Sequence, residues 1–234
     1  MQILLGMIAI AIAYILGSIP FGLLIVKLKT GQDIRSIESG RTGGTNAMRA
    51  AGFWAGFLTA ILDILKGAAS VWLAYWLAPE MRLFQVLAPI AAIVGHNYSI
   101  FLPERSENGR FLRLRGGAGG APSVGGAFGL WATSILIIVP LGALIFFTVG
   151  IASVTTMSVA LLAILIFGVR AWLGLTPWID VLYGVLAEIL LLWALRPNLQ
   201  RLFAGQERIV KYSLNGWLRA RREKRHVEGA GKAV

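Results

Sequence analysis

The segment from Asp33 to Arg49 carries residue types that suit the binding of an anion. Glycine lets backbone N–H groups converge, hydroxyl and amide side chains donate further hydrogen bonds, and arginine offers a planar charged fork to phosphate oxygens. A helix that begins near Asn46 would add the positive end of its dipole. The alternative interpretation is a flexible polar loop, and this segment alone does not separate the two. The candidate phosphate ligands are Ser39, Gly40, Arg41, Thr45, Asn46 and Arg49.

A second glycine-rich segment, 115–123, leads into an apolar run. A glycine-rich turn at the start of a helix again suits an anion, whereas the alternative is close packing of helices by small residues. Gly116, Gly117 and Gly119 are the candidate ligands in this segment. A third segment, 153–156, adds the hydroxyl of Ser153 to the candidates for substrate binding.

A few ionisable residues lie inside or at the end of apolar runs, where such groups are costly and therefore informative. Asp63 and Lys66 lie three residues apart on one helix face, so we predict a structural ion pair. Glu188 has no local partner and must be protonated, face a cavity or meet a cation such as Lys66. His96 closes a run near the membrane interface, where a lone histidine is more often a structural hydrogen-bonding group than a catalyst.

The composition of the 234-residue chain excludes a soluble domain, because 57% of its residues are hydrophobic, only 14% are charged, and the mean hydropathy is +0.73. The absence of cysteine rules out disulfides, thiolate catalysis and cysteine-bound metals. Two histidines make a metal site built from several histidines improbable. The net charge of +11 indicates membrane topology and contact with anionic lipids, and nucleic acid is the weaker interpretation.

The distribution of lysine and arginine predicts an all-α polytopic membrane protein with seven transmembrane helices, some of them short. The segments 27–52 and 196–232 are both strongly basic, so the positive-inside rule places both in the cytoplasm and the N-terminus outside. An odd number of crossings is then required. We therefore divide 121–168 into three short spans that turn near 131–134 and 150–155, which leaves Arg170 outside. The predicted spans are 3–26, 53–77, 84–102, these three, and 178–195.

The organisation predicted from this pattern is a single transmembrane domain over 1–201 and a basic cytoplasmic tail over 202–234. The tail is amphipathic, and Trp217 is its candidate interface anchor.

In their order and spacing these motifs resemble the acyl-phosphate-dependent glycerol-3-phosphate acyltransferase family of bacterial membrane enzymes. The resemblance implies transfer of a fatty acyl group from acyl phosphate to the 1-hydroxyl of glycerol 3-phosphate, in the bacterial cell membrane. It also implies seven spans with the N-terminus outside, roles for His96, Arg49 and Asn198 in catalysis, and no metal, nucleotide or other cofactor. The matching segments are 16–22, 33–35, 39–49, 63–67, 95–96, 116–119 and 198–207.

The chain departs from the family pattern in three places. In the segment 33–49, here called loop one, Glu38 and Arg41 replace the first Gly and the Asn of Gly-Ser-Gly-Asn. Ala118 stands where the family has a phosphate-binding Lys, and Leu195 stands where it has the His of His-Arg-Glu-Asn. Our hypothesis is that Arg41 supplies the missing positive charge from the other loop, although Arg and Lys differ in shape.

Two other functions stay open from the sequence. One is a catalytically weakened family member that binds acyl phosphate or a lysolipid, which the replaced Lys and His favour. The other is a small transporter that uses Glu188, against which stand the missing internal repeat and the clustering of unusual residues on one face. Acyl chain length, donor preference and oligomeric state are not specified by the sequence.

Overall fold

The structure is a computed structural model that describes residues 1–105, 112–210 and 212–231, with side chains up to residue 222. The described chain is mostly helical and adds one short antiparallel hairpin in which Glu104 pairs with Arg113. Two 3-10 turns, Ile34–Ser36 and Ala132–Ser134, lie between helices. The elements are α1 (Gln2–Ser18), α2 (Phe21–Thr30), α3 (Gly44–Ala51), α4 (Phe53–Leu77), α5 (Arg82–Asn97), β1 (Pro103–Arg105), β2 (Leu112–Leu114), α6 (Gly120–Leu130), α7 (Ile135–Val149), α8 (Ala152–Trp172), α9 (Ile179–Ala194), α10 (Arg196–Phe203) and α11 (Leu214–Gly231).

The bundle is apolar on its outside, as expected of a protein whose solvent is lipid. Large side chains such as Leu136 and Trp76 are 70% and 78% exposed. Small residues lie inside, where α1, α4 and α5 meet through Ala9, Ala74 and Ala88, which is how membrane helices pack closely. Among the described residues, four helical segments are long and apolar enough to cross a membrane: Gln2–Thr30, Phe53–Leu77, Ala132–Val149 and Ala152–Trp172. The chain is therefore a multi-pass membrane protein.

The predicted division of 121–168 into three helices is confirmed. The breaks fall at 131–134 and at 150–151, between α6, α7 and α8. These helices have 11, 15 and 21 residues, so α8 is longer than predicted and includes Arg170 in its last turn.

Two predicted spans end earlier than expected. The span predicted over 3–26 breaks after Ser18 because Pro20 has no N–H to continue the helix, and α2 follows as a separate helix. The span predicted over 84–102 ends at Asn97, where the chain turns toward the hairpin.

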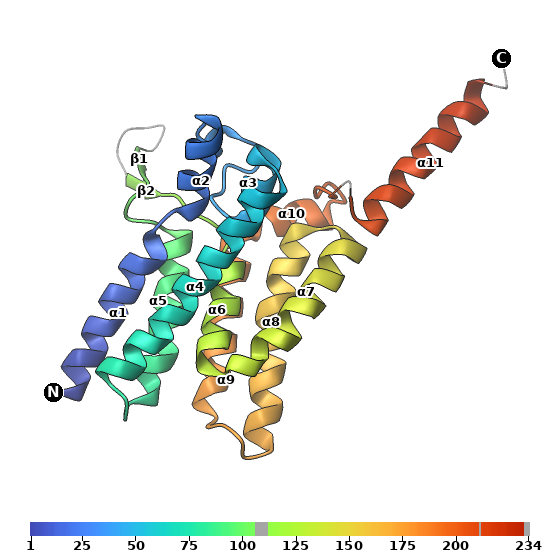
Figure 1. The fold of residues 1–234 in the computed structure, drawn as a ribbon. Coiled ribbons are helices and arrows are strands. Elements are labelled where there is room, and N and C mark those ends of the chain that lie inside the picture. Colours follow the sequence, from blue (N-terminus) through green and yellow to red (C-terminus); the bar gives the residue numbers. More distant parts are fainter. Residues whose placement is uncertain (106–111, 211, 232–234) are drawn as a thin grey trace.

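All three loops with candidate ligands lie at the same end of the bundle, as predicted. In Figure 1 this upper end carries α2, α3, the hairpin, α10 and the turn from α7 to α8. The N-terminus and the turns from α4 to α5 and from α8 to α9 lie at the opposite end. The bundle thus brings distant segments of the chain to one face.

The segment after α10 returns to the bundle before α11 projects away from it (Figure 1). The N–H of Val210 donates to the carbonyl of Gly150 at 2.7 Å, and Asn215 donates to the carbonyl of Val149 at 3.0 Å. The predicted boundary near residue 201 stays a prediction, and the structure places Val210 and Asn215 against the end of α7.

Candidate active site

A cavity of about 460 Å³, the first cavity, lies where the three loops meet. It is bounded by loop one and α3, by the starts of α6 and α8, and by the region around α10. Three of the predicted site residues, Gly40, Gly116 and Gly117, lie outside it and line a neighbouring space. The predicted residues that line the first cavity are Ser39, Arg41, Thr45, Asn46, Arg49, His96, Gly119, Ser153 and Asn198.

Three helices begin at this cavity. The first residues of α3, α6 and α8 all line it, so unpaired backbone N–H groups and three positive dipole ends converge on one space. The start of α6 depends on Gly119, which adopts the left-handed conformation (φ 86°) and lies against Leu191 and Ile93. This arrangement favours an anion in the cavity.

Two predicted ligands face the cavity without a partner in the described part of the chain. The hydroxyl of Ser153, in the first turn of α8, is 3% exposed and forms no hydrogen bond. The exposed guanidinium of Arg49 lines the cavity from α3 and forms neither a hydrogen bond nor an ion pair there. Both groups are therefore available to a ligand.

Asn46 has a different role from the one expected. Its Nδ2 donates to the carbonyls of Ile34, Ile37 and Arg41 at 3.2, 3.0 and 2.9 Å, so the amide nitrogen is occupied by loop one itself. At the start of the same loop, Asp33 accepts hydrogen bonds from the backbone and side chain of Arg35, and this contact lowers the pKa of the Asp33 carboxyl. Asn46 thus supports the site by fixing the shape of the loop.

Arg41 joins loop one to the glycine-rich segment 115–123, here called loop three, and to the end of α9. Its Nη1 donates to the carbonyl of Gly117 at 3.0 Å, and its Nη2 donates to the carbonyl of Ala194 at 2.5 Å and to Oδ1 of Asn198 at 3.3 Å. Burial and the nearby charge of Arg201 lower the pKa of the Arg41 guanidinium. The guanidinium lies next to Ala118, because its partner Gly117 is the preceding residue.

Polar side chains form a cluster next to Arg41, and the sequence predicted only part of this cluster. Asn198 donates from Nδ2 to Glu207 at 3.0 Å, and Arg201 donates to the other oxygen of Glu207 at 3.2 Å. Glu38 forms an ion pair with Arg208 across the rim. Asn198 is thus held by neighbours on both sides. The charged tail residues that line the first cavity were interpreted from the sequence only as determinants of membrane topology. Nothing in their spacing along the chain links them to loop one.

The predicted ion pair of Asp63 and Lys66 is confirmed, with 2.7 Å between Oδ1 and Nζ. The sequence did not show that His96 completes it: Nζ of Lys66 lies 3.0 Å from Nδ1 of His96 and donates to the carbonyl of Ile19. Lys66 is therefore not a partner for Glu188, and that option is wrong. Within the described residues, Oε2 of Glu188 is buried without a hydrogen bond.

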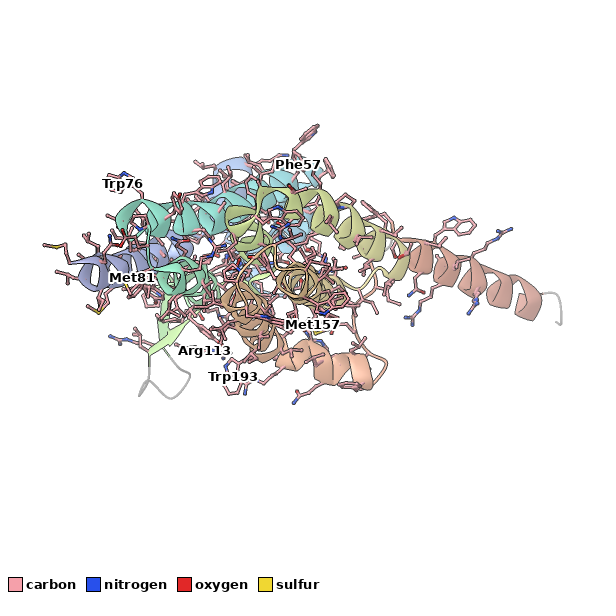
Figure 2. The ribbon with its side chains drawn as sticks, turned by 90° about the horizontal axis from the view of Figure 1, so that it is seen from below. Phe57, Trp76, Met81, Arg113, Met157 and Trp193 are labelled. Carbon is pink, nitrogen blue, oxygen red and sulfur yellow. The ribbon has the colours of Figure 1, made fainter. Side chains whose placement is uncertain are left out.

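One wall of the first cavity is apolar. Phe53, Gly56, Phe57 and Ala60 of α4 line it, together with Phe146 of α7. The ring of Phe57 is partly exposed and lies at one edge of the molecule in Figure 2. The first cavity thus combines a positively charged part with an apolar wall.

Residues 7–205 match the family model described as glycerol-3-phosphate acyltransferase. The chain belongs to this family. It is 35% identical to the glycerol-3-phosphate acyltransferase of Nitrobacter winogradskyi over 202 residues, which cover 86% of this chain and 94% of the relative. It is also 35% identical to the enzyme of Rubrobacter xylanophilus over 208 residues, covering 88% and 95%.

Solved structures agree with this family assignment. The crystal structure of PlsY (YgiH), an integral membrane glycerol 3-phosphate acyltransferase, in its glycerol 3-phosphate form is 28% identical, with a TM-score of 0.73 over 87% of this chain and 94% of that one. Its lysophosphatidic acid form is 26% identical, with a TM-score of 0.71 over the same shares.

The glycine run of this acyltransferase packs directly on His96. The N–H of Gly117 donates to the carbonyl of His96 at 2.8 Å, and a Cβ on Gly117 would overlap Nε2 of the ring. Gly117 is therefore required for close approach of loop three to α5, in addition to any contact with substrate.

Replacement of Gly117 by alanine is expected to destabilise the protein by about 1–3 kcal/mol, because the added methyl group has no space. The matched control is Gly168→Ala in α8, where a Cβ would meet nothing within 4 Å. Thermal unfolding in detergent measures both variants. Equal stability of Gly117→Ala and Gly168→Ala would contradict the packing described here.

Proposed function

We propose that this acyltransferase transfers a fatty acyl group from an acyl phosphate to the 1-hydroxyl of glycerol 3-phosphate, giving lysophosphatidic acid and phosphate in phospholipid synthesis. Its family membership supports the acceptor and the reaction class. The observation that carries the proposal is the convergence of Arg41, Arg49 and three helix N-termini on one cavity that also has an apolar wall.

The proposed donor fits the residues of the site. An acyl phosphate is a mixed anhydride that is already activated, so no covalent nucleophile is required of the protein. The 1-hydroxyl oxygen attacks the carbonyl carbon, the bond from that carbon to the phosphate oxygen breaks, and the hydroxyl proton leaves with the phosphate. The tasks left to the protein are positioning and stabilisation of negative charge.

The residues divide between these tasks. Arg49, Thr45 and the free hydroxyl of Ser153 bind phosphate oxygens, with Arg41 as an added cation. Asn198 faces the glycerol side of the cavity from α10. His96 acts mainly from behind the site, because its ring contacts Lys66 and its carbonyl holds Gly117.

The donor is tested by incubating the purified protein with labelled glycerol 3-phosphate and either palmitoyl phosphate or palmitoyl-CoA. Lysophosphatidic acid is expected with palmitoyl phosphate as the donor and not with palmitoyl-CoA. Product from the thioester alone would contradict the proposed donor. Binding of palmitoyl phosphate without product would favour the catalytically weakened binding protein, for which the replacements at Ala118 and Leu195 are the specific observation.

We further propose seven membrane crossings in the bacterial cell membrane, by α1, α4, α5, α6, α7, α8 and α9, with the N-terminus outside and the basic tail inside. The N-terminus lies at one end of the bundle, and α10 and α11, which follow the last span, lie at the other end (Figure 1), which supports an odd number of crossings. Exposed tryptophans such as Trp76 and Trp172 near the end opposite the loops fit an aromatic belt at an interface.

Single cysteines at the N-terminus and near residue 215 test this topology, because the chain has no native cysteine to react. A membrane-impermeant thiol reagent applied to intact cells is expected to label the N-terminal cysteine only. The tail cysteine should react after the membrane is opened. Labelling of both cysteines from the same side would contradict the proposed orientation, and with it the placement of the three loops on the cytoplasmic side.

A further inference from the structure

A second cavity, of about 650 Å³, adjoins the first cavity at Arg41. It is formed by β2, the end of α5 and the junction of α9 with α10. Figure 2 shows Arg113 and Trp193, which both line it, close together at the edge of the molecule away from Phe57. The two cavities share four lining residues, Ser39, Arg41, Asn198 and Arg201.

The charge of the second cavity is positive. Its described lining contains no carboxylate and five arginines: Arg41, Arg113, Arg115, Arg196 and Arg201. Arg115 is neutralised by Glu104 at 2.7 Å, and Arg201 by Glu207 at 3.2 Å. The other three arginines form no ion pair with a described carboxylate, so their charge is available to an anion.

One of these arginines is already held in position. The guanidinium of Arg196 stacks over the ring of Trp193, with 3.4 Å between its carbon and the ring centroid, and its Nε donates to the carbonyl of Trp193 at 3.1 Å. The opposite faces and edges of the guanidinium remain free for a ligand.

An unsatisfied buried amide points to a polar ligand in the same place. Asn97, the last residue of α5, lines the second cavity and is 4% exposed. Neither its Nδ2 nor its Oδ1 has a hydrogen-bond partner among the described residues. Buried polar groups are normally paired, so a ligand whose oxygen atoms accept and donate hydrogen bonds would supply the missing partners of the Asn97 amide.

We propose that the second cavity is a phosphate-binding site in which Arg113, Arg196 and Asn97 hold the anion and Arg41 is shared with the first cavity. The ligand is free orthophosphate, a small phosphate ester such as glycerol 3-phosphate, or the phosphate of a lipid headgroup. This proposal does not depend on the acyl-transfer reaction, because Asn97, Arg113 and Arg196 do not line the first cavity.

The test is a titration of the detergent-purified protein with orthophosphate and, separately, with glycerol 3-phosphate, followed by calorimetry. The wild type is expected to bind orthophosphate at two sites. The double variant Arg113→Ser/Arg196→Ser should lose at least about tenfold in affinity at one of them, since each charge-assisted contact contributes strongly. Arg49→Ala should weaken the other site. The control is Arg105→Ser, an exposed arginine of β1 that lines neither cavity.

A third arm uses nanodiscs with and without phosphatidic acid, in which loss of lipid binding in the double variant identifies a headgroup as the source. Both arginines are exposed, so their replacement is expected to leave the fold intact. If the double variant nevertheless does not fold, the two single variants are measured instead, and each should lose part of the affinity for phosphate. Binding of orthophosphate, glycerol 3-phosphate and phosphatidic acid as tightly as the wild type by the double variant would overturn the proposal. A wild type that makes no lysophosphatidic acid, yet loses one phosphate site in the double variant, would contradict the proposed function alone.

Discussion

Replacement of Arg49 by alanine is expected to lower kcat/KM for lysophosphatidic acid formation by roughly tenfold to a hundredfold or more, because a hydrogen bond to a charged group contributes about 1.5–3 kcal/mol. Arg49 lines the first cavity and has no partner in the described structure that would occupy its charge. The same exposure means that its removal costs little stability. Activity should fall while the melting temperature in detergent stays unchanged.

The control for this prediction is Arg105→Ala, which removes an arginine from the same end of the bundle outside both cavities. Initial rates are measured for both variants over a range of glycerol 3-phosphate concentrations. Full activity of Arg49→Ala would show that loop one is only a connector.

Replacement of Arg41 by asparagine is expected to impair the enzyme severely, and the second substitution Ala118→Lys should recover much of the loss. The guanidinium of Arg41 lies beside loop three, one residue from the position where the family carries Lys. Lysine at 118 would return one positive charge to the same cavity from the other side. The two substitutions should therefore be far from additive, as expected for groups that serve one ligand.

The design of this pair separates charge from structure. Arg41 also donates to the carbonyls of Gly117 and Ala194, so Arg41→Asn removes hydrogen bonds that hold the loops together. A lysine at 118 is not expected to replace the bond to Ala194, so recovered activity without recovered thermal stability would assign the effect to the charge. Ala118→Lys alone is the control. A harmless Arg41→Asn would end the idea of compensation.

Much of the fold follows from local properties of the sequence. The breaks around 131–134 and 150–151 were predictable because an even number of spans conflicts with the basic tail. The pair of Asp63 and Lys66 was predictable because they lie three positions apart on one helix. The break at Pro20 was not predicted from the continuous apolar run, because hydropathy does not reflect the missing backbone N–H of proline.

The remainder of the site depends on contacts between distant segments. His96 meets Lys66 across 30 positions, and Arg41 meets Asn198 across 157. Nothing in either local pattern encodes these distances. The sequence also could not show that Asn46 uses its donors on its own loop, because the same residue type at a helix start fits either a ligand contact or a loop clamp.

The second cavity illustrates the same limit. Arg113 and Arg196 look like ordinary basic residues of two separate cytoplasmic segments, and the positive-inside rule accounts for both. Only the folded chain brings Arg113 of β2 and Arg196 of α10 into one space with the unpaired Asn97.

The central claim is that this chain is an acyl-phosphate-dependent acyltransferase in spite of Ala118 and Leu195. The most direct test measures lysophosphatidic acid and inorganic phosphate together, in one reaction of the purified wild-type protein with palmitoyl phosphate and glycerol 3-phosphate. The expected result is equal amounts of both products, formed only when both substrates are present. Absence of lysophosphatidic acid, with palmitoyl phosphate bound or hydrolysed independently of glycerol 3-phosphate, would contradict the claim.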